Sequence, residues 1–197
     1  FALENYRDQL AAFPQTVWVS EDILLDLADS QTPQGIVAVV QKEEVGQADF
    51  SQGKFLFLED VQDPGNVGTI IRTADAAGFT GVIVSDKSAD IYSLKTLRSM
   101  QGSHFHLPIY RMTSQALLEE AKKAGIPVLA TTLSKDSKDY RDLPHLDQFV
   151  LVMGNEGQGI SSLMAESADQ LVHISMKGQA ESLNVAVAAG ILIFHLS

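Results

Sequence analysis

The sequence predicts an α/β protein built on a mostly parallel sheet with helices on both faces. Apolar segments of strand length alternate with segments of helical periodicity from Lys54 onward, and this alternation is typical of parallel sheets covered by helices. A length of 197 residues allows one substantial core and a small additional unit. We therefore expect a main domain over 54–197, preceded by part of a small α/β domain over 1–42 and a polar linker over 43–53.

In the main domain the expected elements follow each other regularly. Strands are expected at 54–61, 81–86, 107–111, 127–133, 149–154 and 171–176. Helices are expected at 67–78, 114–125, 161–168 and 183–196. The segment 91–105 has a mixed pattern, and the charged segment 134–147 is expected to be a loop.

The preceding segment predicts two strands and one helix. Residues 16–20 and 34–42 have the apolar character of strands, and the second of these is expected to be buried. Residues 21–29 predict a short helix capped by Ser20. Because the sequence begins at Phe1 rather than at a methionine, we expect that residues precede it in the intact protein.

The composition excludes several classes of function. The chain has no cysteine, so disulfides, thiolate metal sites and cysteine nucleophiles are excluded, and a cytoplasmic location is expected. The five histidines show no metal-binding spacing, and no apolar run reaches the roughly 20 residues of a membrane span. The net charge of −11 argues mildly against nucleic-acid binding, but residues 54–111 carry six basic and six acidic side chains.

The segment after the first expected strand combines a turn with a helix that carries one arginine. Pro64 and Gly65 predict the turn, and Asn66 stands where a helix N-cap is expected. Helical spacing places Arg72 away from the apolar face, and Gly68, one turn earlier, leaves room for a ligand or another backbone. Taken alone, this pattern is explained more simply by a capped helix with a solvated arginine.

Two further segments carry polar groups directly after expected strands. Residues 154–160 hold three glycines around Asn155 and Glu156, and a glycine-rich loop in this position can wrap around a small ligand. Ser182 and Asn184 stand at the start of the last helix, where capping by Ser182 is a sufficient structural explanation.

The last expected helix, 183–196, is apolar on nearly every side. Such a helix must be buried all round. Burial in the core of the domain and burial against a second copy of the chain agree equally well with the pattern.

Together, the three segments resemble the motifs of the SpoU family of RNA ribose 2′-O-methyltransferases, within the knotted SPOUT class. The resemblance covers residues 54–197, and residues 1–42 are similar to the end of a ribosomal-protein-like substrate-binding domain found in many members. Leu94, Ser175 and Ala186 depart from the family pattern at positions without an assigned catalytic role. The matching positions are Asn66, Gly68 and Arg72, then Gly154, Asn155, Glu156, Gly157 and Gly159, then Ile174, Met176, Ser182, Leu183 and Asn184.

The resemblance implies transfer of a methyl group from S-adenosyl-L-methionine to a ribose 2′-hydroxyl of RNA, with rRNA favoured over tRNA and no metal. It also implies a deep trefoil knot near the C-terminus that forms the cofactor pocket. The implied cofactor-binding residues are Thr131, Thr132, Leu133, Gly154, Asn155, Gly157, Ile174, Met176 and Leu183. The implied catalytic residues are Asn66, Arg72, Glu156, Ser182 and Asn184.

The resemblance also suggests roles for these residues. Arg72 would stabilise the ribose alkoxide, Asn66 would hold Arg72 or the ribose, and Glu156 would fix the arginine and its own loop. Family members are dimers through their last helices, so Arg72 is expected to meet a cofactor bound by the partner subunit. Lys95, Arg98 and Arg111 are candidate contacts to the RNA backbone.

Two other functions remain open on the sequence. A dinucleotide-dependent oxidoreductase would use Gly65, Gly68 and Asp86, which follows the turn by about 20 residues, where a ribose-binding acid is expected. The glycine spacing, however, lacks the complete dinucleotide-binding pattern. A non-catalytic RNA-binding module on the same fold is the other alternative, and the intact candidate catalytic residues argue against it.

Overall fold

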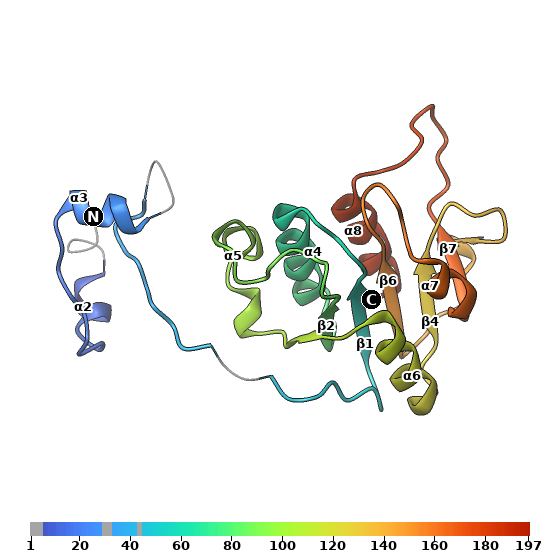
Figure 1. Ribbon diagram of the computed structural model, residues 1–197, viewed down its shortest axis with the longest axis horizontal. Helices are drawn as coiled ribbons and strands as arrows, with labels where there is room; N and C mark the ends of the chain where they lie inside the picture. The colour runs from blue at the N-terminus through green and yellow to red at the C-terminus, as the bar shows by residue number, and fades with distance from the viewer. Residues whose placement is uncertain (1–5, 29–32, 43–44) are drawn as a thin grey trace. The chain divides into compact units, whose positions relative to one another are not determined.

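A computed structural model describes residues 6–28, 33–42 and 45–197. The chain divides into two compact units, Phe1–Glu44 and Val45–Ser197. The second unit contains the whole sheet (Figure 1). In the described part of the chain, no helix combines the length and apolar character needed to cross a membrane.

The sheet has seven strands in the order β3-β2-β1-β6-β4-β7-β5, and every pairing between them is parallel. The predicted α/β fold is therefore confirmed. Central pairing aligns Leu56 of β1 with Leu151 of β6. The strands are β1 (Lys54–Leu58), β2 (Gly81–Val84), β3 (Ile109–Arg111), β4 (Val128–Thr131), β5 (Lys138–Asp139), β6 (Phe149–Met153) and β7 (Gln170–His173).

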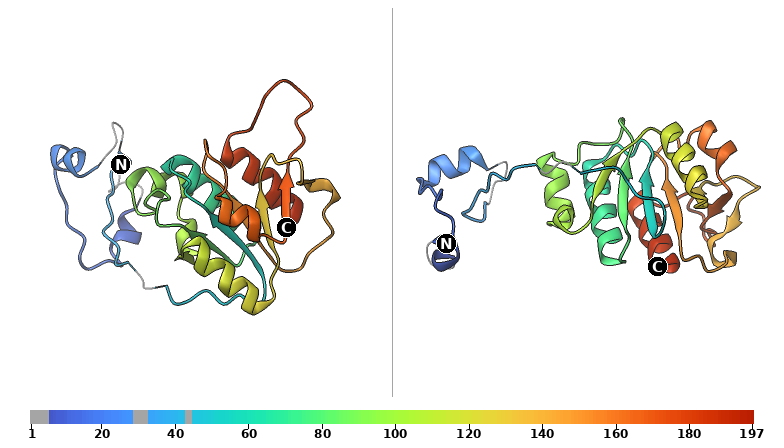
Figure 2. Two further views of the ribbon diagram at one scale, coloured as in Figure 1. Left: turned by 45° about the vertical axis from the view of Figure 1, so that its right-hand side comes forward. Right: turned by 90° about the horizontal axis from the view of Figure 1, so that it is seen from below.

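Helices cover both faces of the sheet, as Figure 2 shows. One face carries α4 (Pro64–Ala76), α5 (Leu94–Met100) and α8 (Val185–Leu196), and the other carries α6 (Ser114–Ala124) and α7 (Ser162–Ser167). Two short 3₁₀ helices, η1 (Ser103–Phe105) and η2 (Tyr140–Asp142), complete the domain. The segment 134–147, expected to be a loop, thus contains both β5 and η2.

The alternation of side chains along β1 fixes the two layers of core. Leu56 and Leu58 are fully buried beneath α4 and α8, whereas Phe55 and Phe57 are buried beneath α6. Burial on both faces explains why the strands are almost continuously apolar. The core therefore holds the strand ends, and the loops that follow them, in fixed positions.

The first unit differs from the prediction. It contains α2 (Arg7–Leu10) and α3 (Glu21–Leu27), and the Ser20 hydroxyl accepts a hydrogen bond from the N–H of Ile23, as predicted for an N-cap. The strands predicted at 16–20 and 34–42 are absent, and Val39 is 99% exposed rather than buried. A strand needs a neighbouring strand to pair its backbone groups, and the described residues of this unit provide none.

Two predicted helix caps were also wrong. Helix α4 begins at Pro64 and is capped by Asp63, whose carboxylate accepts a 2.9 Å hydrogen bond from the Asn66 N–H. Proline is favoured in the first turn because its missing N–H has no partner there. Helix α8 is capped by Asn184, which accepts from two backbone N–H groups, and not by Ser182. Asn66 and Asn184 therefore both lie at the start of a helix, but only Asn184 caps its helix.

Gly68 allows α5 to pack closely on α4. A methyl group added at Gly68 would lie 2.6 Å from the carbonyl oxygen of Thr96 and 3.0 Å from the backbone nitrogen of Met100. The sequence left open whether a ligand or another backbone approaches this glycine. In the structure it is another backbone, that of α5. The space beneath the α4 helix is therefore occupied by α5.

Gly68→Ala is expected to lower the free energy of unfolding by about 1–3 kcal/mol, because the added methyl group overlaps the α5 backbone. Alanine favours a helix over glycine by about 1 kcal/mol, so any loss must come from the contact between helices. Urea unfolding measures the difference. Thr69→Ala, at the neighbouring exposed position, should change stability little, and a Gly68→Ala protein as stable as the wild type would contradict the packing argument.

Candidate active site

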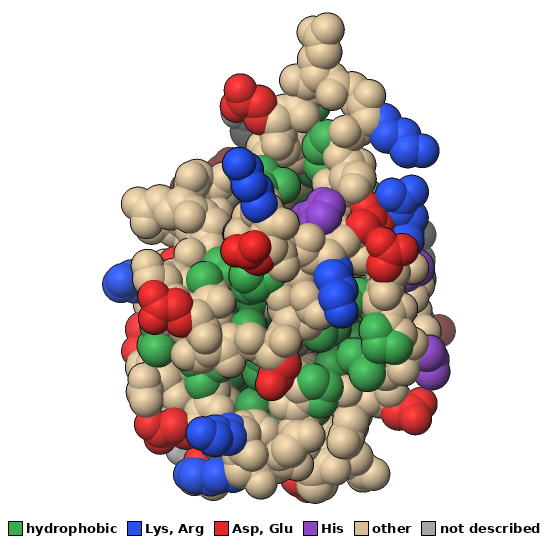
Figure 3. All heavy atoms as spheres, turned by 90° about the vertical axis from the view of Figure 1, so that its right-hand side faces the viewer, with side chains coloured by type: hydrophobic (Ala, Val, Ile, Leu, Met, Phe, Trp, Pro, Cys, Tyr) green, Lys and Arg blue, Asp and Glu red, His purple; other side chains and the backbone are tan. Residues whose placement is uncertain are grey.

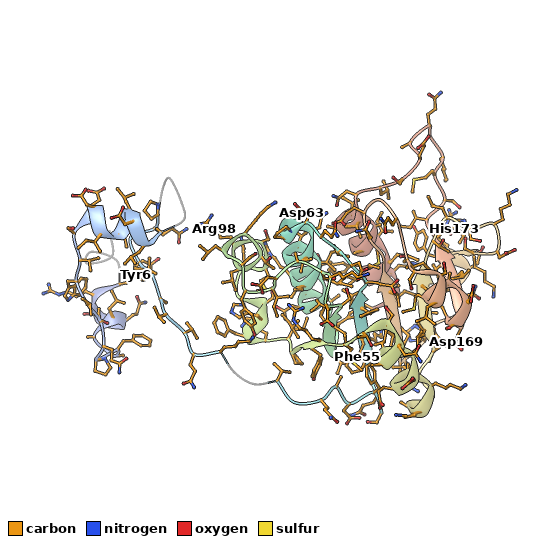
Figure 4. All side chains as sticks on the ribbon, in the orientation of Figure 1. Tyr6, Phe55, Asp63, Arg98, Asp169 and His173 are labelled. Atoms are coloured by element: carbon orange, nitrogen blue, oxygen red, sulfur yellow. The ribbon has the colours of Figure 1, made fainter. Side chains whose placement is uncertain are left out.

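The loops that carry the three motifs meet at one edge of the sheet. Because all strands run in parallel, their carboxyl ends lie together, and ligands of such sheets bind at this edge. Figure 4 shows Asp63, after β1, and His173, at the end of β7, at this edge, whereas Phe55 and Asp169 lie at the opposite edge. The segment between β7 and α8 extends beyond the sheet at the same edge (Figure 1).

A cavity of about 470 Å³ lies among these loops, within the usual size range of small-molecule sites. Its walls come from the segments that follow β4, β6 and β7, and its floor includes α8. All nine residues expected to bind the cofactor line this cavity, together with Glu156 and Ser182. The nine are Thr131, Thr132, Leu133, Gly154, Asn155, Gly157, Ile174, Met176 and Leu183.

Nine further residues line the cavity without having been assigned to the cofactor. Gln158, Gly159 and Glu181 lie in the segments that the family resemblance implied would enclose the cofactor, whereas the other six were not predicted. The hydrophobic ones supply the apolar floor. The nine further residues are Met153, Gln158, Gly159, Val172, His173, Glu181, Val185, Ala188 and Leu192.

The charges of the lining restrict the ligand. Glu156 and Glu181 line the cavity, and no lysine or arginine lines it within the part of the chain that the structure describes. Figure 3 shows the side of the molecule on which β7 lies, where acidic and basic side chains are interspersed. A cavity with two carboxylates and no cation suits a ligand with positive charge and disfavours one with a pyrophosphate.

The glycine-rich loop is a tight turn held by Asn155. The Asn155 side-chain oxygen accepts hydrogen bonds from the N–H groups of Gly157 and Gln158, both 2.9 Å, and its backbone pairs with Gly159. A methyl group added at Gly154 would lie 2.4 Å from the carbonyl carbon of Gly159. Only glycine fits at this position, because the loop folds back onto its own start.

The segment after β1 anchors this loop. The Asn155 amide donates to the carbonyl oxygen of Asp60 at 2.8 Å. Both oxygens of Glu156 accept hydrogen bonds of 3.2 Å, from the backbone N–H groups of Gln62 and Asp63. The first and second motifs therefore bind each other directly, through backbone groups that need partners.

Two asparagines link all three motifs. Asn66 donates from its side chain to Glu156 at 3.0 Å and accepts a 3.1 Å hydrogen bond from the side chain of Asn184. Burial by itself would raise the pKa of Glu156, but the hydrogen bonds from Asn66 and from backbone N–H groups outweigh it and hold the pKa below its usual value. Glu156 is therefore ionised at neutral pH and acts as an acceptor.

Arg72 lies outside the cavity. It is exposed on α4, and its guanidinium makes no hydrogen bond or ion pair with any described residue. The expected contacts of Glu156 and Asn66 with Arg72 are not formed, because these two side chains bind each other. Lys95, a candidate RNA contact, pairs with Asp63 at 2.8 Å and lowers the pKa of that carboxyl.

The geometry excludes the dinucleotide-binding alternative. Gly65, Gly68 and Asp86 do not line the cavity, and the space next to Gly68 is filled by α5. Nor do three His, Asp or Glu side chains gather anywhere in residues 6–28, 33–42 and 45–197 in a way that could hold a metal ion.

The fold and the site define an α/β protein that binds a small ligand in a cavity formed by loops at the carboxyl ends of parallel strands. A family model described as the SpoU rRNA methylase family matches residues 53–194. The chain belongs to this family, as the sequence motifs predicted.

Relatives agree with this assignment. The 23S rRNA (guanosine(2553)-2′-O)-methyltransferase RlmP of Bacillus subtilis is 44% identical over 182 residues, covering 92% of this chain and 72% of the relative. A crystal structure of an AdoMet-bound rRNA methyltransferase from Sinorhizobium meliloti has a TM-score of 0.88 at 35% identity, covering 99% of this chain and 76% of that one. The SpoU methyltransferase AviRb from Streptomyces viridochromogenes has a TM-score of 0.83 at 30% identity, covering 98% and 77%.

Glu156→Gln is expected to lower the free energy of unfolding at pH 7 by about 1 kcal/mol, because an amide cannot accept all three hydrogen bonds. The pKa of Glu156 is depressed in the folded protein, so its contribution is present above the unfolded pKa and is lost as the pH falls through the folded pKa. The difference between variant and wild type should therefore shrink from pH 7 to pH 3 in urea unfolding experiments.

The matched control is Gln158→Ala, an exposed position of the same loop, which should show no such pH dependence. A difference between Glu156→Gln and wild type that stays constant across this pH range would contradict the assigned hydrogen bonds.

Proposed function

We propose that this protein transfers a methyl group from S-adenosylmethionine to a ribose 2′-hydroxyl of rRNA. The observation that carries the proposal is the cavity that the second and third motifs line, with two carboxylates and no lysine or arginine among its described lining residues. The first motif is tied to both of them by the hydrogen bonds of Asn66. Membership of the SpoU rRNA methylase family and the similarity to an AdoMet-bound rRNA methyltransferase support the same reaction. The relative named as a 23S rRNA 2′-O-methyltransferase favours rRNA over tRNA as the substrate.

The residues of the cavity fit this cofactor. S-adenosylmethionine brings a methyl group activated on a positively charged sulfonium. The apolar floor around Met153 and Leu192 suits its adenine ring, and the glycine-rich loop presents backbone groups to its polar parts. Glu156 and Glu181 supply negative charge to the lining, which favours a cation.

Arg72 is the residue proposed to activate the ribose hydroxyl. A hydroxyl is a poor nucleophile at neutral pH unless its proton is removed or its anion is stabilised. A guanidinium stays charged in proteins and therefore cannot act as the base. Arg72 instead stabilises the developing alkoxide and a neighbouring RNA phosphate with its paired donors, and the phosphate is available to take the proton.

Asn66, Glu156, Ser182 and Asn184 position the reacting groups. The chain of hydrogen bonds from Asn184 through Asn66 to Glu156 joins the start of α8 to the start of α4 and to the glycine-rich loop. Ser182 lines the cavity two residues before this chain. Displacement at a methyl group requires the attacking oxygen and the methyl donor to be aligned. This network keeps the three motifs in fixed positions relative to one another.

We infer that the active form is a homodimer through α8. The helix buries Val185, Ala189 and Leu192 in its own domain, but Val187 and Phe194 are 52% and 59% exposed. Val187, Gly190, Ile191 and Phe194 follow helical spacing and form an apolar stripe. A second copy of the same helix would cover this stripe.

The dimer also explains the position of Arg72. Because Arg72 does not line the cavity of its own subunit, it is available to a cavity of the partner subunit. Each active site then combines an arginine from one subunit with a cofactor cavity from the other. A cytoplasmic location, where rRNA is processed, completes the proposal.

The wild-type protein is expected to bind S-adenosylhomocysteine but not NAD in calorimetry, and to methylate rRNA at a ribose that primer extension can map. Arg72→Lys should retain S-adenosylhomocysteine binding and lose at least about 100-fold in turnover, because a lysine lacks the paired donors. Binding of RNA without methyl transfer by the wild type would favour the non-catalytic module, and near-normal turnover of Arg72→Lys would contradict the role of the arginine.

Mixing two inactive variants tests the shared site. Arg72→Ala keeps its cavity, whereas Gly154→Ala keeps its arginine but clashes within the glycine-rich loop. If the site is shared between subunits, co-refolded mixtures should recover about a quarter of wild-type activity, from the mixed dimers.

The control for this mixture places Phe194→Asp in both variants, which should prevent pairing and abolish the recovery. Mixed dimers detected by mass spectrometry without any recovered activity would show that Arg72 acts within its own subunit.

A further inference from the structure

We propose that Glu59 is a positioning residue of the cofactor cavity: its buried carboxylate holds the end of the glycine-rich loop through Ser161. The proposal rests on the proposed function, since it concerns affinity for the same cofactor. The motifs recognised in the sequence do not include Glu59.

Glu59 is a buried carboxylate with an unusual set of partners. It directly follows β1 and is 3% exposed. One oxygen accepts a 2.8 Å hydrogen bond from the Ser161 N–H, and the other accepts from the hydroxyls of Ser161 and Ser114 at 2.7 and 2.5 Å. A buried carboxylate is costly unless its oxygens are satisfied, and here three donors satisfy them.

The donors belong to the starts of two helices. Ser161 is the N-cap of α7, and Ser114 is the first residue of α6. Within the described residues, no lysine, arginine or histidine forms an ion pair with Glu59. Neutral donors alone therefore hold the carboxylate. Because hydrogen bonds depend on direction, the position of the Glu59 carboxylate fixes the positions of Ser114 and Ser161.

Ser161 connects Glu59 to the cavity. It stands two residues after Gly159, which lines the cavity and pairs with Asn155 across the turn. The segment after β1 thus holds the loop at both ends: Asp60, Gln62 and Asp63 bind its first residues, and Glu59 binds Ser161, directly after its last residue. Without Glu59, the second end of the loop loses its hydrogen bonds to this segment.

A carboxylate at this position binds its donors more strongly than a neutral amide would. Ser161 offers two donors, an N–H and a hydroxyl, to two different oxygens of Glu59. In Glu59→Gln one oxygen becomes an NH₂ donor. Because the Ser161 N–H can only donate, this NH₂ must face the two serine hydroxyls, which turn to accept from it. The substitution keeps the side-chain volume but replaces hydrogen bonds to a charged group by weaker neutral ones.

Glu59→Gln is expected to raise the Kd of S-adenosylhomocysteine about tenfold, the loss expected for one hydrogen bond to a charged group. The KM for S-adenosylmethionine should rise with it, while kcat at saturating cofactor stays near the wild-type value, because Arg72 and the RNA contacts are untouched. Calorimetry and steady-state kinetics on the full chain measure these effects.

Two further variants separate positioning of the loop from simple loss of stability. Ser114→Ala removes a hydrogen bond to the same carboxylate but on α6, away from the loop, and should change the Kd less than twofold. Ser161→Ala, which also removes the cap of α7, should weaken cofactor binding. Glu59→Gln should weaken binding less in the Ser161→Ala background than in the wild type, because the hydroxyl contact is already gone. If Glu59→Gln does not fold, Glu59→Asp takes its place, because a shorter carboxylate keeps the charge but cannot reach both Ser161 donors.

The outcomes are distinct. Equal cofactor affinity in wild type and Glu59→Gln, or equal losses in Ser114→Ala and Ser161→Ala, would overturn the proposal. Wild-type protein that does not bind S-adenosylhomocysteine at all would instead overturn the proposed function.

Discussion

Hydrogen bonding between the segment after β1 and the glycine-rich loop is the constraint on which the site depends. The segment 59–63 leaves the sheet with backbone groups that need partners, and the loop after β6 supplies them through Asn155 and Glu156. Because β1 and β6 are neighbouring parallel strands in the buried centre of the sheet, the two segments emerge side by side. The core thereby transmits its rigidity to a loop of small residues that has little packing of its own.

Acidic and basic groups lie in different parts of the site, the acidic ones in the cavity and the arginine on the surface. Acidic groups stand in the cavity, where a sulfonium would bind, and Arg72 stands outside it, where a polyanion would approach. A cation inside the cavity would compete with the cofactor, and an acidic group in place of Arg72 would repel RNA. The overall negative charge of the chain is thus compatible with a nucleic-acid substrate, because its local arrangement matters more than its sum.

The sequence predicted the sheet and the main helices, because apolar periodicity reports local requirements. The residues that line the cavity were implied by the resemblance of three motifs to a known family. The sequence did not predict which asparagine caps its helix. The Asn66 side chain does not cap α4 because it forms hydrogen bonds with Glu156 and Asn184, which lie 90 and 118 residues away along the chain. The exposed segment 34–42 has the composition of a buried strand, but composition does not supply a pairing partner. Glu59 gave no signal because its partners, Ser114 and Ser161, come near it only in the folded chain.

The first strand and the last helix of the domain hold each other. The Lys54 ammonium donates a 2.9 Å hydrogen bond to the carbonyl oxygen of Leu196, at the carboxyl end of α8, where a positive charge is favourable. The domain consequently closes on itself only after α8 has been synthesised, and the contacts that complete the cavity are among the most distant along the chain. Slow folding with late acquisition of cofactor binding is the expected kinetic signature of such a topology.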